Sequence, residues 1–131
     1  MLNGKIAEIQ SSLNLRYSTR LVIDNLFGPE TKKALVIALQ TELNVQYGAN
    51  LVTDGIFGVK TKSACINVYY GAKGNITWLI QAMLYCRGYN AGGLDYEFGD
   101  EMLKAVKCFQ VNNGLTADGI VGKNTFEKLF V

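Results

Sequence analysis

The chain has 131 residues, 49% of them hydrophobic and 18% charged, and its 13 basic and 11 acidic side chains give a net charge of +2. A chain of this length can bury a core as one domain or as two small ones, and so low and scattered a charge argues against a nucleic-acid partner. Histidine is absent, so the commonest zinc ligand and the base of Ser/His/Asp and Cys/His catalysis are missing, which argues against those enzyme classes.

The N-terminal stretch, residues 1–10 (MLNGKIAEIQ), has no basic segment leading into a long apolar run. Nowhere do about 18 apolar residues stand together, as a membrane span requires. We therefore expect a chain that is made in the cytoplasm without a signal peptide and has no membrane partner. The three cysteines, Cys65, Cys86 and Cys108, lie in apolar helical patterns without C-x-x-C pairing, so we expect buried free thiols.

Apolar side chains recur at helical spacing in six segments, and these segments predict six helices. The most linker-like stretch, residues 71–75 (GAKGN), separates the first three from the last three. We expect an all-α fold of two tandem three-helix domains, residues 1–70 and 76–131, joined by the linker 71–75. In chain order, the apolar positions are Ile6, Ile9 and Leu13; Leu35, Ala38, Leu39 and Leu43; Ala64 and Val68; Leu79, Ile80, Met83 and Leu84; Met102, Ala105, Val106 and Phe109; and Phe126, Leu129 and Phe130.

A loop of the form D-x-x-F-G precedes four of these helices. Its aspartate, often followed by glycine, suits a tight turn, and its second glycine lets the chain turn into the next helix. The apolar residue at its fourth position is expected to enter the core. The loop residues are Asp24, Phe27 and Gly28; Asp54, Gly55, Phe57 and Gly58; Asp95, Phe98 and Gly99; and Asp118, Gly119, Val121 and Gly122.

A glutamine lies upstream of every loop, at Gln10, Gln40, Gln81 and Gln110. The distance from glutamine to aspartate is 14 residues in the first three copies (24−10, 54−40, 95−81) and 8 in the last (118−110). After three of the loops a threonine lies in the first helical turn, where it can bond back toward the loop. One helix-loop-helix unit is therefore used four times, fused because single units could not bury their own apolar faces. The threonines are Thr31, Thr61 and Thr125; Met102 replaces threonine, and Asn25 and Tyr96 replace the turn glycine.

This pattern resembles the three-helix peptidoglycan-binding domain family. The closer match is in the second half, at residues 105–110 (AVKCFQ), 114–122 (GLTADGIVG) and 125–129; the first half matches at 38–40, 54–58 and Thr61. The resemblance implies binding to peptidoglycan or another wall polymer. It also implies a covalently attached N-acetylmuramoyl-L-alanine amidase, muramidase or peptidase, as in a phage endolysin or a Gram-positive autolysin that acts at the cell wall.

Side chains suited to a wall ligand gather between each first helix and its loop. Aromatic faces, amides and a few cations would contact sugar hydroxyls, amides and carboxylates. The tyrosines can equally pack beneath the loops, the arginines can be ordinary solvated charges, and Trp78 is expected in core or interdomain packing. The candidate ligand-binding residues are Arg16, Tyr17 and Arg20; Gln46, Tyr47 and Asn50; and Arg87, Tyr89 and Asn90.

Other functions stay open at this point. Paired carboxylates can cleave glycosides without histidine, but turns account for the aspartates. A three-helix nucleic-acid binder would need a basic recognition helix, and none of the six is rich in Lys and Arg. A structural or dimerisation module, with a homo-oligomer as its product, is the alternative to wall binding. We expect a binding module with no catalytic residue, metal or cofactor, and two domains would permit divalent attachment.

Overall fold

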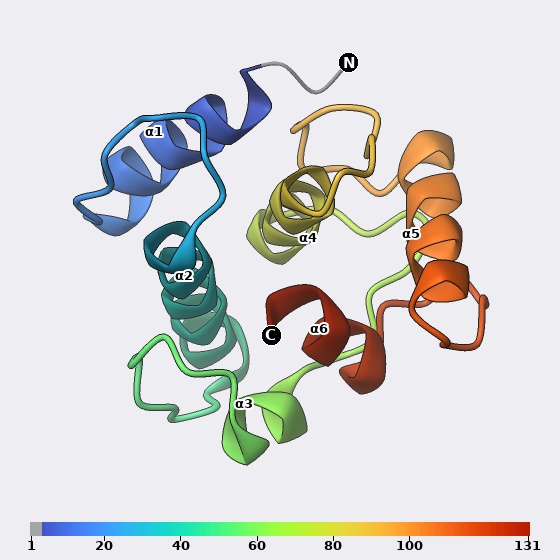
Figure 1. The fold of residues 1–131 in the computed structure, drawn as a ribbon. Coiled ribbons are helices and arrows are strands. Elements are labelled where there is room, and N and C mark those ends of the chain that lie inside the picture. The colour runs from blue at the N-terminus through green and yellow to red at the C-terminus, as the bar shows by residue number, and fades with distance from the viewer. Residues whose placement is uncertain (1–3) are drawn as a thin grey trace.

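A computed structural model describes residues 4–131 of the chain. Within this range there are six α-helices and no strand, which confirms the predicted all-α class. The helices are α1 (Lys5–Tyr17), α2 (Pro29–Tyr47), α3 (Val59–Ala64), α4 (Asn75–Cys86), α5 (Asp100–Asn112) and α6 (Lys123–Phe130) (Figure 1).

The described helices range from 6 to 19 residues in length. None of them is long and apolar enough to cross a bilayer. The first three residues of the N-terminal stretch, on which the signal-peptide prediction partly depends and which belong to the predicted domain 1–70, lie outside the described residues.

A glycine precedes each helix that follows a repeat loop. Gly28, Gly58, Gly99 and Gly122 are extended, with φ between −97° and −116°. Any residue adopts this conformation, so backbone freedom does not explain these glycines as the sequence predicted. Pro29 is the first residue of α2, where its missing N–H would have no helical partner anyway.

The third helix is shorter than predicted. It ends at Ala64, and Val68, which the apolar spacing placed in the same helix, lies in an antiparallel bridge with Val121. The Val68 N–H donates to the Val121 carbonyl at 3.0 Å, and the reverse bond measures 2.8 Å. This distant partner satisfies both backbone groups of Val68, so the extended conformation replaces the predicted helix.

Helix α4 lies at the centre of the molecule. It packs on α1, α2, α5 and α6, while α1 and α5 lie on opposite sides of it (Figure 1). Every residue from Ile76 to Tyr85 is buried, as expected of a helix that is apolar on all faces. We call α1–α3 the first triplet and α4–α6 the second. The central helix of the fold therefore comes from the second triplet and covers apolar surface of both triplets.

The two helix triplets share an extensive interface. Helix α3 packs mainly on α6 rather than on the helices of its own triplet. Phe57, in the second loop, stacks on Phe130 of α6 with 6.4 Å between ring centroids. The ammonium group of Lys123 donates to the carbonyls of Ser63 and Cys65, both at 2.7 Å. The described helices of the two triplets thus pack against each other along a continuous interface. The division into domains 1–70 and 76–131 stays a prediction.

The segment predicted to be a linker is fixed against the third loop. The Gly71 N–H donates to the Phe98 carbonyl at 2.9 Å, and the Phe98 N–H donates to the Ala72 carbonyl at 2.8 Å. Gly74 donates to the Tyr96 carbonyl at 2.9 Å, and the next residue already begins α4. Residues 71–75 therefore connect the triplets without separating them.

The cysteines differ in exposure. Cys65 is buried and Cys86 half-buried, and burial raises the pKa of each thiol to about 12. Cys108 is exposed, so the prediction of three buried thiols is wrong at this position. It lies on α5 between the buried Val106 and Phe109, and the helical turn directs it to the solvent face.

Candidate binding site

The glutamine upstream of each loop is buried and holds that loop in place. The Gln10 amide nitrogen donates to the Asp24 carboxylate at 2.9 Å, the Leu26 carbonyl at 3.0 Å and the Thr31 hydroxyl at 3.0 Å. Its amide oxygen accepts the N–H groups of Asp24 and Asn25. Gln10 therefore joins the loop to the helices on both sides of it.

The same arrangement recurs in the other copies. Gln40 and Gln110 each donate to an aspartate, a loop carbonyl and a threonine, at 2.9 to 3.1 Å. Gln81 bonds Asp95 and the Glu97 carbonyl, but Met102 takes the place of the threonine. The constant spacing from glutamine to aspartate thus reflects a direct side-chain contact.

The aspartates act as turn residues. Each accepts the N–H two residues ahead, for example Leu26 to Asp24 at 3.0 Å. Bonds from the glutamine and from the loop backbone lower the pKa of Asp24 and Asp95, and the same two kinds of bond, the backbone one stronger, lower that of Asp54. The carboxylates are therefore already hydrogen-bonded within their loops.

The residues that replace the turn glycine adopt its conformation. Asn25 and Tyr96 have φ values of 61° and 69°, close to the 76° of Gly55. The Asn25 side chain accepts the Ala7 N–H of α1 at 2.9 Å, and the Tyr96 ring lies 6.1 Å from the Trp78 ring. These contacts favour the larger side chains at positions where glycine would cost less strain.

The apolar residues at the fourth loop position are buried to different degrees. Phe98 and Val121 enter the core as predicted. Phe27 and Phe57 pack against the core but stay only half-buried, so they enter it less completely than predicted. The Arg87 guanidinium lies 5.3 Å from the Phe27 ring centroid.

Arg16, a predicted ligand contact, lies between the two triplets. Its guanidinium is 4.5 Å from the Trp78 ring centroid and 5.0 Å from that of Tyr96. One of its nitrogens, Nη2, donates to the Asn75 side chain at 2.9 Å. The stacking contributes cation–π attraction across the interface. Trp78 is 2% exposed, which confirms its predicted packing role.

Tyr17 is the neighbour of Arg16 and is also engaged. Its hydroxyl donates to the buried Glu42 carboxylate at 2.7 Å, and burial together with this bond raises its pKa. Glu42 also accepts bonds from Gln46 at 2.7 Å and Asn75 at 3.2 Å. These groups join α1, α2 and α4.

The third predicted cluster, Arg87, Tyr89 and Asn90, also makes its contacts within the protein. Arg87 donates twice to the Leu129 carbonyl, at 3.0 and 2.8 Å. The Tyr89 ring packs edge-on against Phe109, and the Asn90 side chain accepts the Gly92 N–H within its own turn. All three predicted residues therefore have internal partners.

The remaining predicted residues lie in two different places. Arg20 and Asn50 are exposed beside the first and second loops. Tyr47 shares the cleft beside the second loop with Asn50, and together with Gln46 it also opens onto a pocket of about 400 Å³ between the two triplets. The structure thus brings Gln46 and Tyr47 together with residues that the sequence reasoning did not select.

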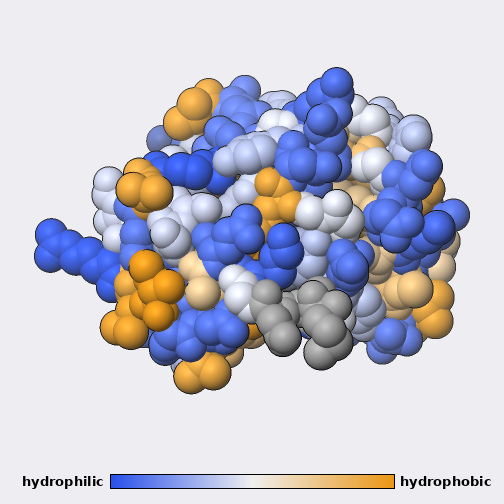
Figure 2. Space-filling view, turned by 90° about the horizontal axis from the view of Figure 1, so that it is seen from above, coloured by the Kyte–Doolittle hydropathy of each residue, from blue (hydrophilic) through white to orange (hydrophobic). Residues whose placement is uncertain are grey.

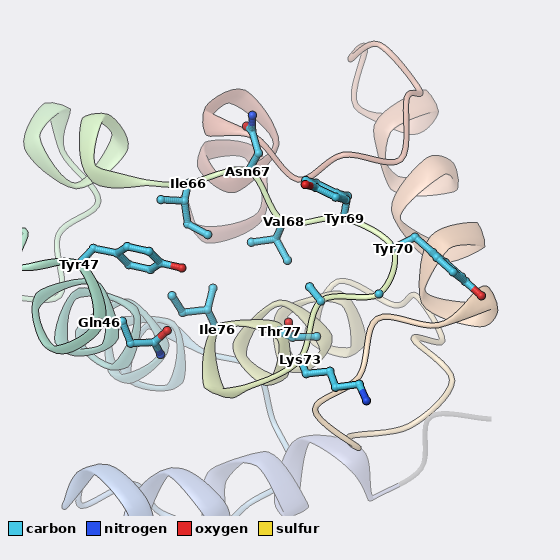
Figure 3. Close-up of a pocket in the computed structure, with 12 residues that line it drawn as sticks. Gln46, Tyr47, Ile66, Asn67, Val68, Tyr69, Tyr70, Lys73, Ile76 and Thr77 are labelled. Carbon is cyan, nitrogen blue, oxygen red and sulfur yellow. The ribbon is translucent and has the colours of Figure 1, made fainter.

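We call this hollow the junction pocket (Figure 3). Its volume lies within the range of about 300 to 1,000 Å³ that small-ligand sites occupy. The tyrosine pair Tyr69 and Tyr70, directly before the linker-like stretch 71–75, was the signal that could have pointed to it. It is lined by Gln46 and Tyr47 at the end of α2, by residues 66–73, and by Ile76 and Thr77 at the start of α4.

Clefts of similar volume lie beside the first, second and fourth loops. The cleft at the first loop has a volume of about 350 Å³ and that at the fourth loop about 310 Å³. Both run from the loop aspartate to the first turn of the following helix. In residues 4–131, no group of three or more Cys, Asp or Glu side chains is placed to hold a metal ion.

Comparison with known proteins points to one family. Residues 74–129, which include all of α4 and α5 and most of α6, match the family described as "Putative peptidoglycan binding domain". The chain is 38% identical over 65 residues to the uncharacterized protein FadG of Bacillus subtilis (strain 168). That alignment covers 49% of this chain, but the chain spans only 11% of the length of FadG. No solved structure matches.

Proposed function

We propose that the chain is a non-catalytic module that binds the peptidoglycan of bacterial cell walls. The premise is that residues 74–129 form a domain of the peptidoglycan-binding family. The match to that family is the observation that carries the proposal. The first triplet, which repeats the same loop and packs on the second, extends the surface available to the polymer. Wall binding would hold an attached enzyme on its substrate.

The chemistry of the described side chains supports binding over catalysis. A glycosidase of the usual kind needs two carboxyl groups free to act as acid and base or nucleophile. Asp24, Asp54, Asp95 and Asp118 each accept a bond from a buried glutamine. These carboxylates therefore stabilise loops.

The finer proposal concerns the context of the module. We infer attachment to a wall hydrolase, an amidase, muramidase or peptidase, in an endolysin or autolysin that acts on Gram-positive walls. The FadG alignment supports part of this, because the similar segment there is a small part of a much longer protein. The chain would then be made in the cytoplasm and act at the wall.

Co-sedimentation with purified sacculi tests the proposal. The labelled chain is mixed with sacculi from several Gram-positive species, before and after removal of teichoic acids, over a range of salt concentrations. We expect retention on stripped sacculi without release of soluble wall fragments. A chain that stays in the supernatant with every preparation would rule out wall targeting, and release of reducing sugar would rule out the non-catalytic assignment.

One observation favours self-association as a second candidate function. Val22 and Leu26 in the first loop, and Val52 and Ile56 at the equivalent positions of the second, are exposed. On the face shown in Figure 2, apolar side chains form small groups separated by hydrophilic ones. Sedimentation velocity over a concentration series decides, since a single species at the monomer mass excludes a stable homo-oligomer.

A further inference from the structure

The junction pocket is built across the two triplets and is held rigid. Its floor is the 66–73 segment, which the Val68–Val121 bridge and the Gly71 bond to the Phe98 carbonyl fix against the second triplet. Its two sides are the end of α2 and the start of α4, helices that pack against each other. The pocket is therefore preformed, as small-ligand sites usually are.

Aromatic and aliphatic side chains give the pocket its apolar surface. Tyr47 and Tyr69 are 54% and 57% exposed, so their rings are open to a ligand. Tyr47 reaches from the end of α2 toward Ile66 and Ile76 (Figure 3). A tyrosine ring offers a flat apolar face together with a polar tip. Such faces suit the C–H surfaces of pyranose rings.

The polar side chains of the pocket are mostly neutral. Asn67 offers an exposed amide, Gln46 offers one whose nitrogen also donates to Glu42 at 2.7 Å, and Lys73 is the charged side chain among the lining residues. The Lys73 ammonium lies 3.6 Å from the Glu97 carboxylate. These groups match the hydroxyl and N-acetyl groups of amino sugars.

The same set of lining side chains is poorly suited to bind the peptide stems of peptidoglycan. Their carboxylates would require cations, preferably arginines. Arg16 and Arg87 instead bond within the protein, to Asn75 and to the Leu129 carbonyl. The pocket is thus better suited to the sugar part of peptidoglycan than to its charged peptide part.

We propose that the junction pocket binds the glycan strand of peptidoglycan. Tyr47 and Tyr69 stack on pyranose rings, and Gln46 and Asn67 bond N-acetyl groups. Because its walls come from both triplets, one chain has one such composite site. The inference rests on the proposed function and adds the position of the site and the chemical class of its ligand.

Titration of the full chain with separated wall components tests this. The probes are peptide-free glycan strands and, separately, free stem peptides, with binding followed by amide chemical shifts. Tyr47→Ala and Tyr69→Ala should each weaken strand binding about tenfold, a loss in the range that stacked aromatic contacts supply. Tyr47→Phe, which keeps the ring, should bind nearly as well as the parent. Val111→Ala, at an exposed apolar position on α5, is the matched control and should change nothing.

The outcomes separate this inference from the proposed function. Unchanged strand binding by both alanine variants, with unchanged circular dichroism, would show that the pocket is not the site. Binding of stem peptides but not strands would show that the ligand class is wrong. If the parent chain still sediments with whole sacculi in either case, wall binding stands without this site. If the parent chain does not sediment, the proposed function itself fails.

Discussion

Gln110 makes four hydrogen bonds in a site that water does not reach. Its side chain bonds Asp118, Thr125 and the backbone of Gly119 and Ile120, and it is 0% exposed. Methionine has a similar size and can make none of these bonds. We expect Gln110→Met to lower the free energy of unfolding by about 3 kcal/mol, because several buried polar groups lose their partner. Urea denaturation measures this.

Lys128→Met is the control for that experiment. Lys128 is exposed on α6, so its replacement should change the free energy of unfolding by less than about 0.5 kcal/mol. Equal effects of the two substitutions would contradict the role assigned to the buried glutamine.

The loop aspartates predict a dependence of stability on acid pH. Hydrogen bonds lower the pKa of Asp24, Asp54 and Asp95 below the ordinary value of 3.8. Because the pKa values of these carboxyl groups are lower in the folded state than in the unfolded state, the ionised carboxylates stabilise the folded state at pH values above about 4. This stabilisation is lost as the pH falls below about 4 and through the lowered folded pKa values.

The triple variant Asp24→Asn/Asp54→Asn/Asp95→Asn removes these three titrations while keeping an oxygen acceptor at each turn. We expect its urea midpoint to lie below that of the parent at pH 7, where the ionised carboxylates stabilise the parent, and to fall less than the parent's between pH 5 and pH 2, so that the two midpoints approach each other in acid. The same acid sensitivity in both proteins would mean that other groups control the acid transition.

Single residues show what the sequence could and could not reveal. Constant spacing identified Gln40, Asp54 and Thr61 as members of one unit, because their contact is local to a helix-loop-helix. The role of Arg16 was not predictable in this way. Its partner Asn75 lies 59 residues away, and an arginine beneath distant aromatic rings looks the same in sequence as a solvated one.

At the scale of helices, the third copy shows how packing overrides a repeated motif. Met102, at the start of α5, is 1% exposed and occupies the threonine position. Met102→Thr would give Gln81 another acceptor but would leave a cavity. A net hydrogen bond contributes about 1 kcal/mol, whereas truncating a buried methionine costs roughly 2 to 5 kcal/mol.

We therefore expect Met102→Thr to destabilise the protein by about 2 kcal/mol, although it restores the sequence of the other copies. Thermal denaturation of this variant and of Thr61→Met gives the measurement. The second variant should also be less stable, because it overpacks a buried site and removes an acceptor of Gln40. A more stable Met102→Thr variant would show that the motif outweighs the packing.

The helices themselves were largely predictable, since apolar spacing is a local signal. The end of α3 was not, because Val68 extends to pair with Val121, 53 residues later (121−68). The junction pocket could not be predicted from the sequence for the same reason. Its lining depends on how α2 and α4 meet, which is a contact between segments that the motif treats separately.

At the scale of the whole molecule, the shared interface bears on how the chain could attach to a polymer. Divalent binding with avidity requires two sites that can engage at once. Here α1 and α2 pack on α4, and α3 packs on α6, so the triplets have a fixed relation. A composite site fits this arrangement better than two independent ones.

Separate expression of the two triplets tests that unity. Residues 75–131 contain α4, α5 and α6, which is nearly the segment that matches the family. We expect this fragment to fold alone with a lower Tm than the full chain, because α4 is no longer covered by α1 and α2. Residues 1–74 lose α4 and α6, which leaves the apolar contacts of α2 and α3 in water, so we expect no cooperative thermal transition by circular dichroism. Mixing the two fragments should restore a transition, since their interface is the missing part of the core. If residues 1–74 instead melted cooperatively at the Tm of the full chain, the triplets would be independent domains and divalent attachment would again be the better account of the repeat.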